Sequence, residues 1–348
     1  MFSELARTVA AGQELGPEGM PGLVDALGDA AQPVAERADF LIAWAIRGET
    51  PTEVAALAGE LRNRSVAVPL RESFRQSHEI LDVCGTGGDR LNTFNISTTV
   101  ALICAAAGVP VAKHGNRAIT SKSGSADVLE ALGIPVDLSP EAAARAIEEA
   151  HFAFLFAPRF HPAFKGIAPV RALCAERGQR TVFNRLGPLL NPARPSAQLL
   201  GVSRIDWVEP MAKTLQALGL RRAMVVSGEV PGHGTLDELS TLGTNHIAEF
   251  YQDRGFSAST GSPADFPLAP AALKDLEGGN ADDNAAIIVR LLEGADCGPR
   301  RDAVLLNASA ALFVAARVRS MGEGWELAEQ LLRDRRVLKT LDQLRHSR

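Results

Sequence analysis

Two glycine- and hydroxyl-rich loops occur within residues 84–125, and each of them follows a short apolar run and leads into a helical pattern. The first loop reads GTGGDRLNTFNIST from Gly85, and the second reads KHGNRAITSKSGS from Lys113. Glycine lets backbone N–H groups approach a ligand without interference from a Cβ atom, and a helix N-terminus adds partial positive charge. Two such loops on neighbouring strands predict a concave pocket for a ligand that carries two or more phosphates.

The common phosphate motifs do not describe these loops. GTGGD lacks the spacing of the dinucleotide motif G-x-G-x-x-G, and no lysine follows Gly88 as a Walker loop would require. A tight turn that binds nothing is the alternative, but such a turn needs neither the hydroxyl cluster nor the KHGNR sequence. The loops therefore favour a phosphate site of another kind.

Composition excludes several classes of protein. A chain of 348 residues that is 46% hydrophobic can form one large domain or two unequal ones. A net charge of −5 argues against general nucleic-acid binding, so no nucleic-acid partner is expected. The four cysteines are far apart and form no C-x-x-C pair, which suggests neither a zinc site nor a disulfide framework.

No membrane association is expected either. Glu4 and Arg7 interrupt the N-terminus before the apolar core of a signal peptide could form. The uncharged run from Leu91 to Ala112 is long enough to span a bilayer, but asparagine, glycine and proline interrupt it. We expect a cytoplasmic protein.

Alternation of strand and helix patterns begins at residue 80. Apolar runs predict strands at 80–84, 109–112, 152–156, 198–202 and 222–227, with helices between them at about 98–107, 124–132, 140–150 and 207–218. Such alternation predicts right-handed crossovers and a parallel sheet covered on both faces. Ligands bind beyond the carboxyl ends of the strands in these sheets, where both loops would lie.

The remaining segments read as helical. The first 65 or so residues show no strand pattern, and residues 50–53 (TPTE) form a capping box with proline at the first helical position. Alternation stops between 163 and 192, where Pro169 suits the first turn of a short helix. Helical patterns return after residue 275, at 282–294, 301–317 and 323–335.

Several motifs together resemble the anthranilate phosphoribosyltransferase family. They are GTGGD, NTFNIST, KHGNRAITSKSGSAD, LDELS, FLFAPRFHPAFKGIAPVR (154–171), FNRLGPLLNPA (183–193) and RDAVLLNASAAL (301–312). The resemblance covers nearly the whole chain from about residue 35, and the pairing of KHGNR with GTGGD is highly specific.

The resemblance implies a fold and a division into domains. The fold is α/β, with a small all-helical domain and a larger α/β domain that has a mostly parallel central sheet, as in nucleoside phosphorylases and phosphoribosyltransferases. The helical domain would comprise 1–68 joined by about 163–192, and the α/β domain 69–162 and 193–348. The active site would lie in the cleft between them.

The resemblance also implies an activity. The enzyme would transfer the phosphoribosyl group from phosphoribosyl pyrophosphate to the amine of anthranilate, giving N-(5-phosphoribosyl)anthranilate and pyrophosphate. This Mg²⁺-dependent reaction is the second step of tryptophan biosynthesis from chorismate. The family commonly forms homodimers through its helical domain, and the apolar faces around Phe40, Leu41 and Trp44 exceed what a small domain could bury internally.

The resemblance also assigns site residues, at the positions where this sequence matches the family's motifs. The phosphoribosyl pyrophosphate contacts would be Gly85, Gly88, Asp89, Thr93, Asn95, Ile96, Ser97, Thr98, Lys113, His114, Gly115, Asn116, Arg117, Ala118, Ile119, Thr120, Ser121 and Ser125. The anthranilate contacts would be Gly85, Asn116 and Arg171. The ligands of two Mg²⁺ ions would be Ser97, Asp237 and Glu238.

The residue types suit these roles, although each has another interpretation. A guanidinium pairs well with a benzoate carboxylate, but Arg171 could instead tie the small domain together. Adjacent carboxylates suit Mg²⁺, but an Asp-Glu pair outside the LDE motif is usually a solvated surface pair. His114 could assist proton removal or be structural, so no catalytic residue is assigned with certainty.

The chain departs from the family pattern at Arg90 and Arg185, and the segment 229–236 is long and glycine-rich, as a mobile flap would be.

Two other functions remain open at this point. A related pyrimidine nucleoside phosphorylase would share the fold, but its lysine- and serine-rich glycine loops are absent. A non-catalytic paralogue that binds nucleic acid would lose the metal carboxylates or the KHGNR loop and gain basic patches, and this chain does neither.

Overall fold

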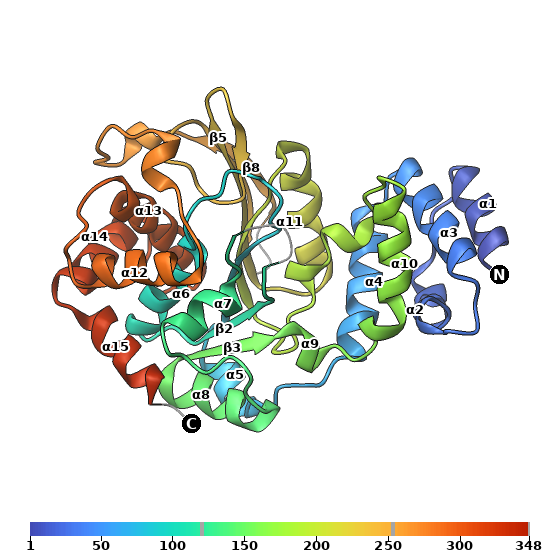
Figure 1. The fold of residues 1–348 in the computed structure, drawn as a ribbon, viewed down its shortest axis with the longest axis horizontal. Coiled ribbons are helices and arrows are strands. Elements are labelled where there is room, and N and C mark those ends of the chain that lie inside the picture. The colour runs from blue at the N-terminus through green and yellow to red at the C-terminus, as the bar shows by residue number, and fades with distance from the viewer. Residues whose placement is uncertain (119–121, 252–254, 347–348) are drawn as a thin grey trace.

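A mixed sheet forms the centre of the structure, a computed structural model that describes residues 1–118, 122–251 and 255–346 (Figure 1). Within these residues the sheet has eight strands in the order β3-β2-β1-β4-β5-β7-β8, and β6 pairs with β5. The strands are β1 (Leu81–Gly85), β2 (Val111–Gly115), β3 (Phe152–Phe156), β4 (Ala197–Gly201), β5 (Arg222–Val230), β6 (Gly234–Leu236), β7 (Asn245–Tyr251) and β8 (Ser257–Gly261).

Strands β1 to β5 pair in parallel, and β6, β7 and β8 join antiparallel. The predicted mostly parallel sheet is therefore confirmed, and the five predicted strands lie within three residues of the observed ones. Strands β6, β7 and β8 are not among the strands predicted from the sequence. The β8 sequence SASTG lies at the exposed edge and has no apolar run, so its pattern carries no strand signal.

The strand order reverses at β1 and β4. The chain continues from β1 to β2 and β3 on one side, and it later enters β4 on the other side and continues to β5. The carboxyl ends of β1 and β4 thus form the switch point at which open α/β sheets bind their ligands. The last residues of these strands, Gly85 and Gly201, are partners in register.

The helices of the described residues include some that cover the two faces of the sheet and others that pack to one side of it. They are α1 (Phe2–Ala10), α2 (Met20–Gly28), α3 (Val34–Arg47), α4 (Pro51–Asn63), α5 (Glu72–Ser77), α6 (Ile96–Ala106), α7 (Ser125–Ala131), α8 (Pro140–Ala150), α9 (Ala157–Phe160), α10 (Phe164–Glu176), α11 (Val208–Ala217), α12 (Ala281–Leu292), α13 (Pro299–Val314), α14 (Met321–Arg333) and α15 (Arg336–Arg345). None of these helices is long and apolar enough to cross a membrane, within the part of the chain that the structure describes.

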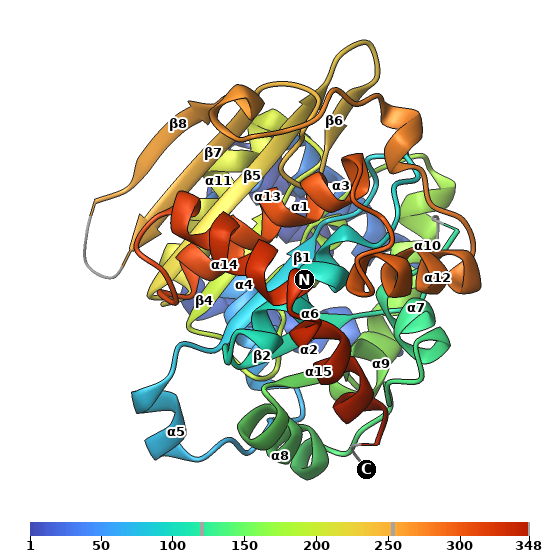
Figure 2. The same ribbon diagram turned by 90° about the vertical axis from the view of Figure 1, so that its left-hand side faces the viewer.

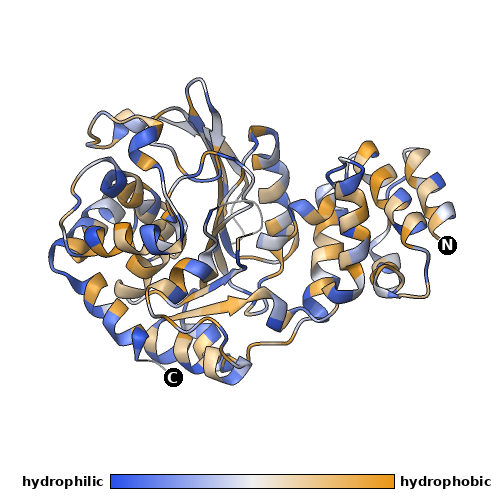
Figure 3. Ribbon diagram, viewed as in Figure 1, coloured by the Kyte–Doolittle hydropathy of each residue, from blue (hydrophilic) through white to orange (hydrophobic). Residues whose placement is uncertain are grey.

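Alternating side chains of the strands enter two different cores. Val83 and Val111 pack with α6 and α13 on one face, where α14 and α15 lie against α6 (Figure 2). On the other face, α11 packs on β5 and β7, and α8 packs on β3. The strand β3 has the sequence FAFLF and is hydrophobic along its length (Figure 3), as expected for a strand covered on both sides.

The N-terminal helices pack together with α10 to one side of the sheet (Figure 1). Helix α10 contacts α2 and α3, and α4 contacts α11. Phe40, Leu41 and Trp44 are fully buried there, because α1 and α10 cover α3. The argument that these residues need a second subunit is therefore wrong. The domain boundaries at 68, 162 and 192 stay a prediction.

Two predictions about helix starts had opposite outcomes. The capping box is confirmed, because Thr50 Oγ1 accepts from Glu53 N at 3.4 Å and Thr50 N donates to Glu53 Oε2 at 2.9 Å. The start at Pro169 is wrong, because α10 begins at Phe164 and holds Pro169 in its interior. Pro169 and Lys165 both lie on the exposed side, where the carbonyl that proline leaves unpaired can bind water.

The segment 229–236 forms a hairpin, and its action as a mobile flap stays a prediction. Strand β5 continues to Val230, and β6 pairs with it from Gly234 to Leu236. The acidic residues Asp237 and Glu238 therefore follow a paired strand, which fixes the direction in which the chain leaves the hairpin.

Candidate active site

Residues 237–240, called the acidic strap below, cross the carboxyl ends of β1, β4 and β5. A Cβ atom at Gly85 would overlap the Asp237 carboxylate, and one at Gly201 would overlap the Asp237 carbonyl. A Cβ atom at Gly228 of β5 would lie 2.5 Å from the amide nitrogen of Ser240. Glycine as the last residue of β1 and of β4, and near the end of β5, thus lets the acidic strap lie directly on the switch point.

The first glycine loop reaches the acidic strap through its backbone. Gly87 N donates to Asp237 Oδ2 at 2.6 Å. Four residues of the loop have positive φ: Gly87 at 70°, Gly88 at 83°, Arg90 at 63° and Asn92 at 52°. The left-handed region is unfavourable for arginine, so its occupation here is local backbone strain of the kind that gathers at functional sites.

Helix α6 begins against the second carboxylate. Ser97 N donates to Glu238 Oε1 at 3.1 Å, so the positive end of the helix dipole faces this carboxylate. Asn95 precedes the helix and accepts a 2.8 Å bond from Asn284. The side chains of Ile96 and Thr98 are buried, so backbone groups are what these two predicted contacts can offer a ligand.

The two strap carboxylates repel one another. Removal from water raises the pKa of Asp237, and the nearby Asp89 carboxylate raises it further. Removal from water likewise raises the pKa of Glu238, with an added contribution from Asp237. A divalent cation would relieve this repulsion, so the pair fits a metal site on electrostatic grounds.

The donor set fits magnesium in particular. The described residues contain no group of three or more His, Cys, Asp or Glu side chains able to hold a metal ion by themselves. Mg²⁺ usually takes one or two carboxylates and completes its shell with phosphate oxygens and water. Asp237 and Glu238 beside two phosphate-type loops supply that combination.

Lys113 lies beneath the first loop. Its Nζ donates to the Val83 carbonyl at 2.6 Å and to Ser97 Oγ at 3.3 Å. Burial lowers the pKa of Lys113, while Asp82 and Glu238 act in the opposite direction. The ammonium therefore lies between β1 and the start of α6, where it can contact a phosphate placed on Ser97.

His114 points to the opposite face of β2 from Lys113. Its Nε2 lies 3.1 Å from Nε2 of His161, and both rings are buried. Burial lowers the pKa of His114 to about 3 and that of His161 to about 4, so both are neutral near pH 7. A neutral His114 could accept a proton, but its Nε2 is already engaged by His161, which favours the structural role.

Asp82 is a buried carboxylate that the sequence analysis missed. Its oxygens accept from Asn191 Nδ2 at 2.9 Å and from His114 N at 3.4 Å. Burial raises the pKa of Asp82 to about 6. An isolated acidic residue inside an apolar strand was the available signal, since such a position requires buried partners.

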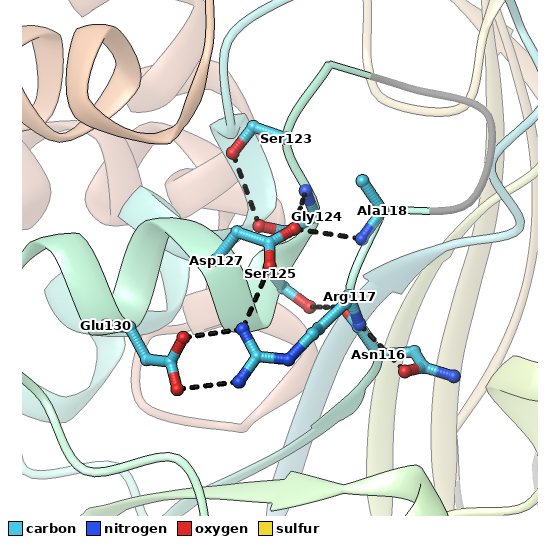
Figure 4. Close-up of polar contacts among 8 residues, drawn as sticks. All are labelled: Asn116, Arg117, Ala118, Ser123, Gly124, Ser125, Asp127 and Glu130. Atoms are coloured by element: carbon cyan, nitrogen blue, oxygen red, sulfur yellow. Dashed lines mark hydrogen bonds and ion pairs between the residues drawn. The ribbon is translucent and has the colours of Figure 1, made fainter.

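The second loop is closed by an acidic side chain (Figure 4). Asp127 Oδ2 accepts from Ala118 N and from Gly124 N, both at 2.9 Å. Arg117 forms a bidentate pair with Glu130 at 2.5 and 2.7 Å and also contacts Asp127. Phosphate binding by Arg117 stays a prediction, since these carboxylates hold its guanidinium. The predicted contacts Ile119, Thr120 and Ser121 lie outside the described residues.

The other predicted contacts of this loop lie where β2 ends and where α7 begins. Asn116 is exposed, and its Oδ1 accepts from Arg117 N at 2.8 Å. Ser125 Oγ donates to the Asn116 carbonyl at 3.4 Å. The loop thus fixes the orientation of the Asn116 amide group, and Asn116 Nδ2 can donate to a ligand.

Arg171 projects from α10 over two aromatic rings. Its guanidinium carbon lies 6.0 Å from the ring centres of Phe164 and Phe183. Arg171 is exposed at the surface, although the protein atoms packed around its guanidinium lower its pKa. No ion pair joins it to an acidic residue within the described ranges. A cation held by aromatic rings rather than by a carboxylate is suited to an anionic ligand.

Comparison with known proteins begins with two family models. The glycosyl transferase family helical bundle domain matches residues 3–65, and the glycosyl transferase family a/b domain matches residues 77–336. An anthranilate phosphoribosyltransferase from Herpetosiphon aurantiacus is 46% identical over 298 residues, which cover 86% of this chain and 84% of that protein. The chain belongs to the anthranilate phosphoribosyltransferase family.

Solved structures of anthranilate phosphoribosyltransferases have the same fold. The enzyme from Thermus thermophilus is 41% identical, has a TM-score of 0.87, and covers 98% of both chains. The enzyme from Saccharomyces cerevisiae, in complex with phosphoribosyl pyrophosphate and Mg, is 25% identical and has a TM-score of 0.82. The alignment covers 95% of this chain and 92% of the yeast chain. The predicted family, enzyme class and fold class are therefore confirmed.

Proposed function

We propose that the protein catalyses Mg²⁺-dependent transfer of the phosphoribosyl group from phosphoribosyl pyrophosphate to the amine of anthranilate. The products are N-(5-phosphoribosyl)anthranilate and pyrophosphate, and the reaction is the second step of tryptophan biosynthesis from chorismate. The observation that carries the proposal is the acidic strap, which brings Asp237 and Glu238 to the glycine ends of β1 and β4 beside the first loop. The yeast relative solved with phosphoribosyl pyrophosphate and Mg supports the same donor.

The first loop and Lys113 would hold the pyrophosphate group of the donor. Gly87, Gly88 and the start of α6 present backbone N–H groups, and Lys113 adds a full positive charge. Asp237, Glu238 and Ser97 would hold two Mg²⁺ ions, which neutralise charge that develops on the leaving pyrophosphate. Fixed donors around that charge lower the barrier because they need no reorganisation during the reaction.

The acceptor would lie between the second loop and α10. The Arg171 guanidinium would pair with the anthranilate carboxylate, and Asn116 would orient the amine. The aromatic amine is already neutral near pH 7, so orientation contributes more than a strong base. The Phe164 and Phe183 rings hold the arginine in place from behind.

One assay tests the proposal. The purified protein is incubated with phosphoribosyl pyrophosphate, Mg²⁺ and anthranilate, and the loss of anthranilate fluorescence is followed. We expect turnover that stops when a chelator removes Mg²⁺. Absence of turnover with all three present would refute the proposal, whereas turnover of a pyrimidine nucleoside with phosphate would favour the phosphorylase alternative.

We also infer a homodimer that forms through the N-terminal helices. The support is an exposed apolar side chain on α3, Ile46 at 77% exposure, together with Met1 at 58% beside α1. A twofold interface is the default for such a surface. Sedimentation that finds a single 36.9 kDa species at micromolar concentration would count against the dimer.

The enzyme is further inferred to work in the cytoplasm. Its four cysteines are free, and Cys297 is exposed. An exposed free thiol is typical of reducing compartments. Fractionation of cells that express a tagged chain would test this inference.

A further inference from the structure

Two buried asparagines each pair with the backbone of one residue of the acidic strap. Asn307 Oδ1 accepts from Leu239 N at 2.9 Å, and Asn307 Nδ2 donates to the Leu239 carbonyl at 2.9 Å. Asn245 Oδ1 accepts from Ser240 N at 2.7 Å, and Asn245 Nδ2 donates to the Ser240 carbonyl at 2.9 Å. Each amide thus bonds both backbone groups of one residue, as a partner in a β-ladder would.

The two asparagines come from different elements. Asn307 lies in the middle of α13 at 0% exposure, and its Nδ2 also donates to the Ala303 carbonyl of the same helix. Asn245 is the first residue of β7, at 3% exposure, and it pairs in register with Gly228. Because water does not reach these amides, their partners must be protein groups in fixed positions.

The acidic strap needs such a hold because no strand or helix includes it. Residues 237–240 follow β6 but belong to no ladder, and the glycines beneath them give clearance without attachment. The neighbouring carboxylates of Asp237 and Glu238 repel one another at the same time. A metal site requires both oxygens at defined positions, and their direction is set by the backbone at both ends of the pair.

We propose that Asn307 and Asn245 are positioning residues that hold Asp237 and Glu238 in the geometry needed to bind Mg²⁺ with the donor pyrophosphate. This inference rests on the proposed function. Both asparagines are buried away from the surface, and each acts through the backbone that follows the acidic pair. Asn307 belongs to the segment RDAVLLNASAAL, so the proposal gives this segment a role in the site.

The test compares Asn307→Ala and Asn245→Ala with Asp302→Ala. Asp302 is a matched control, since it lies on α13, is buried and accepts one backbone N–H, that of Ala269 at 2.9 Å, away from the acidic strap. Binding of phosphoribosyl pyrophosphate is measured by calorimetry without anthranilate across a range of Mg²⁺ concentrations. Backbone amide exchange at Leu239 and Ser240 is measured with neither ligand present.

We expect both asparagine variants to need about 10- to 100-fold more Mg²⁺ for half-maximal donor binding, with excess Mg²⁺ restoring it. Amide exchange should accelerate at Leu239 in Asn307→Ala and at Ser240 in Asn245→Ala. The control should lower the melting temperature without changing either readout. The two variants lie on separate elements, so misfolding of one leaves the other to decide.

Two results separate failure of this inference from failure of the proposed function. An unchanged Mg²⁺ requirement in the asparagine variants, beside a wild type whose donor binding depends on Mg²⁺, would overturn the positioning role alone. A wild type that binds the donor equally well with and without Mg²⁺ would overturn the proposed function.

Discussion

The backbone nitrogen of Gly87 lies 2.6 Å from Oδ2 of Asp237, although 150 positions separate the two residues in the chain. This bond joins the backbone of the first glycine loop directly to a carboxylate of the acidic strap. The phosphate loop and the metal carboxylates are therefore parts of one site, and a change in either should affect the other.

Asp237→Asn and Glu238→Gln should remove most activity and yet raise the melting temperature of the metal-free protein. Each change keeps the shape but removes one of two repelling carboxylates, both of whose pKa values are raised by burial. Thermal melts with and without Mg²⁺ and donor, beside steady-state rates, check this. Asp282→Asn, in an exposed acidic pair on α12, is the control, and equal rates for all three variants would contradict the metal role.

Gly201→Ala should impair catalysis although it adds only one methyl group. The new Cβ would overlap the Asp237 carbonyl, so the acidic strap must shift away from β4. Gly59→Ala is the matched control, because its Cβ in α4 meets nothing closer than Leu218 Cδ2 at 3.8 Å. We expect the control to stabilise the protein by roughly 0.5–1 kcal/mol. Wild-type kinetics in Gly201→Ala would show that the strap position is unimportant.

Arg171→Ala should weaken use of anthranilate by roughly 2–4 kcal/mol, as expected when a charged partner is lost. Binding of phosphoribosyl pyrophosphate should change little, because the aromatic rings that hold Arg171 lie on α10 and the neighbouring 182–184 turn rather than on the glycine loops. Separate KM values for the two substrates, together with a melting curve, give the measurement. Equal damage to both substrates with a lower melting temperature would identify a purely structural arginine.

Acidification should destabilise the protein through the His114–His161 pair. Burial lowers both pKa values from 6.5, to about 3 and about 4, so the unfolded chain binds protons first as the pH falls below 6.5. The stability that depends on neutral rings is complete above pH 6.5 and is lost toward pH 4. Each ring should contribute a loss of about 2 kcal/mol at pH 5 relative to pH 7.

Melting curves between pH 7 and pH 5 test this for His114→Gln, His161→Gln and the double variant. Replacement of both rings should flatten the pH dependence, because glutamine does not titrate. His233→Gln, in the exposed hairpin turn, should keep the wild-type slope. An unchanged slope in the double variant would assign acid sensitivity to other groups.

The sequence predicted what local patterns determine. The five parallel strands and most helices follow from apolar runs of the right period, and the two loops follow from their glycines and hydroxyls. The edge strand β8 could not be predicted, because SASTG buries no apolar side chain. The predicted form of α10 is too short, because proline favours a helix start, whereas Pro169 is an exposed residue inside the helix.

The relationships inside the site could not be predicted, since they join residues distant in the chain. Glycine at position 201 is explained only by the passage of Asp237 above it. The role inferred for Asn307 depends on a partner 68 residues earlier, and the pairing of Arg117 with Glu130 depends on how the second loop folds back. No spacing rule along one sequence encodes these contacts.

Burial of the N-terminal helices by later parts of the chain has a consequence during protein synthesis. The core that contains Trp44 also contains Val170 and Leu215, and Arg62 donates to the carbonyl of Leu189, 127 positions further on. A nascent chain that has emerged only through α4 therefore exposes Phe40 and Trp44 on the ribosome until α10 follows. We expect fragments that stop before residue 164 to aggregate. The first four helices should become protease-resistant only when α10 has been made.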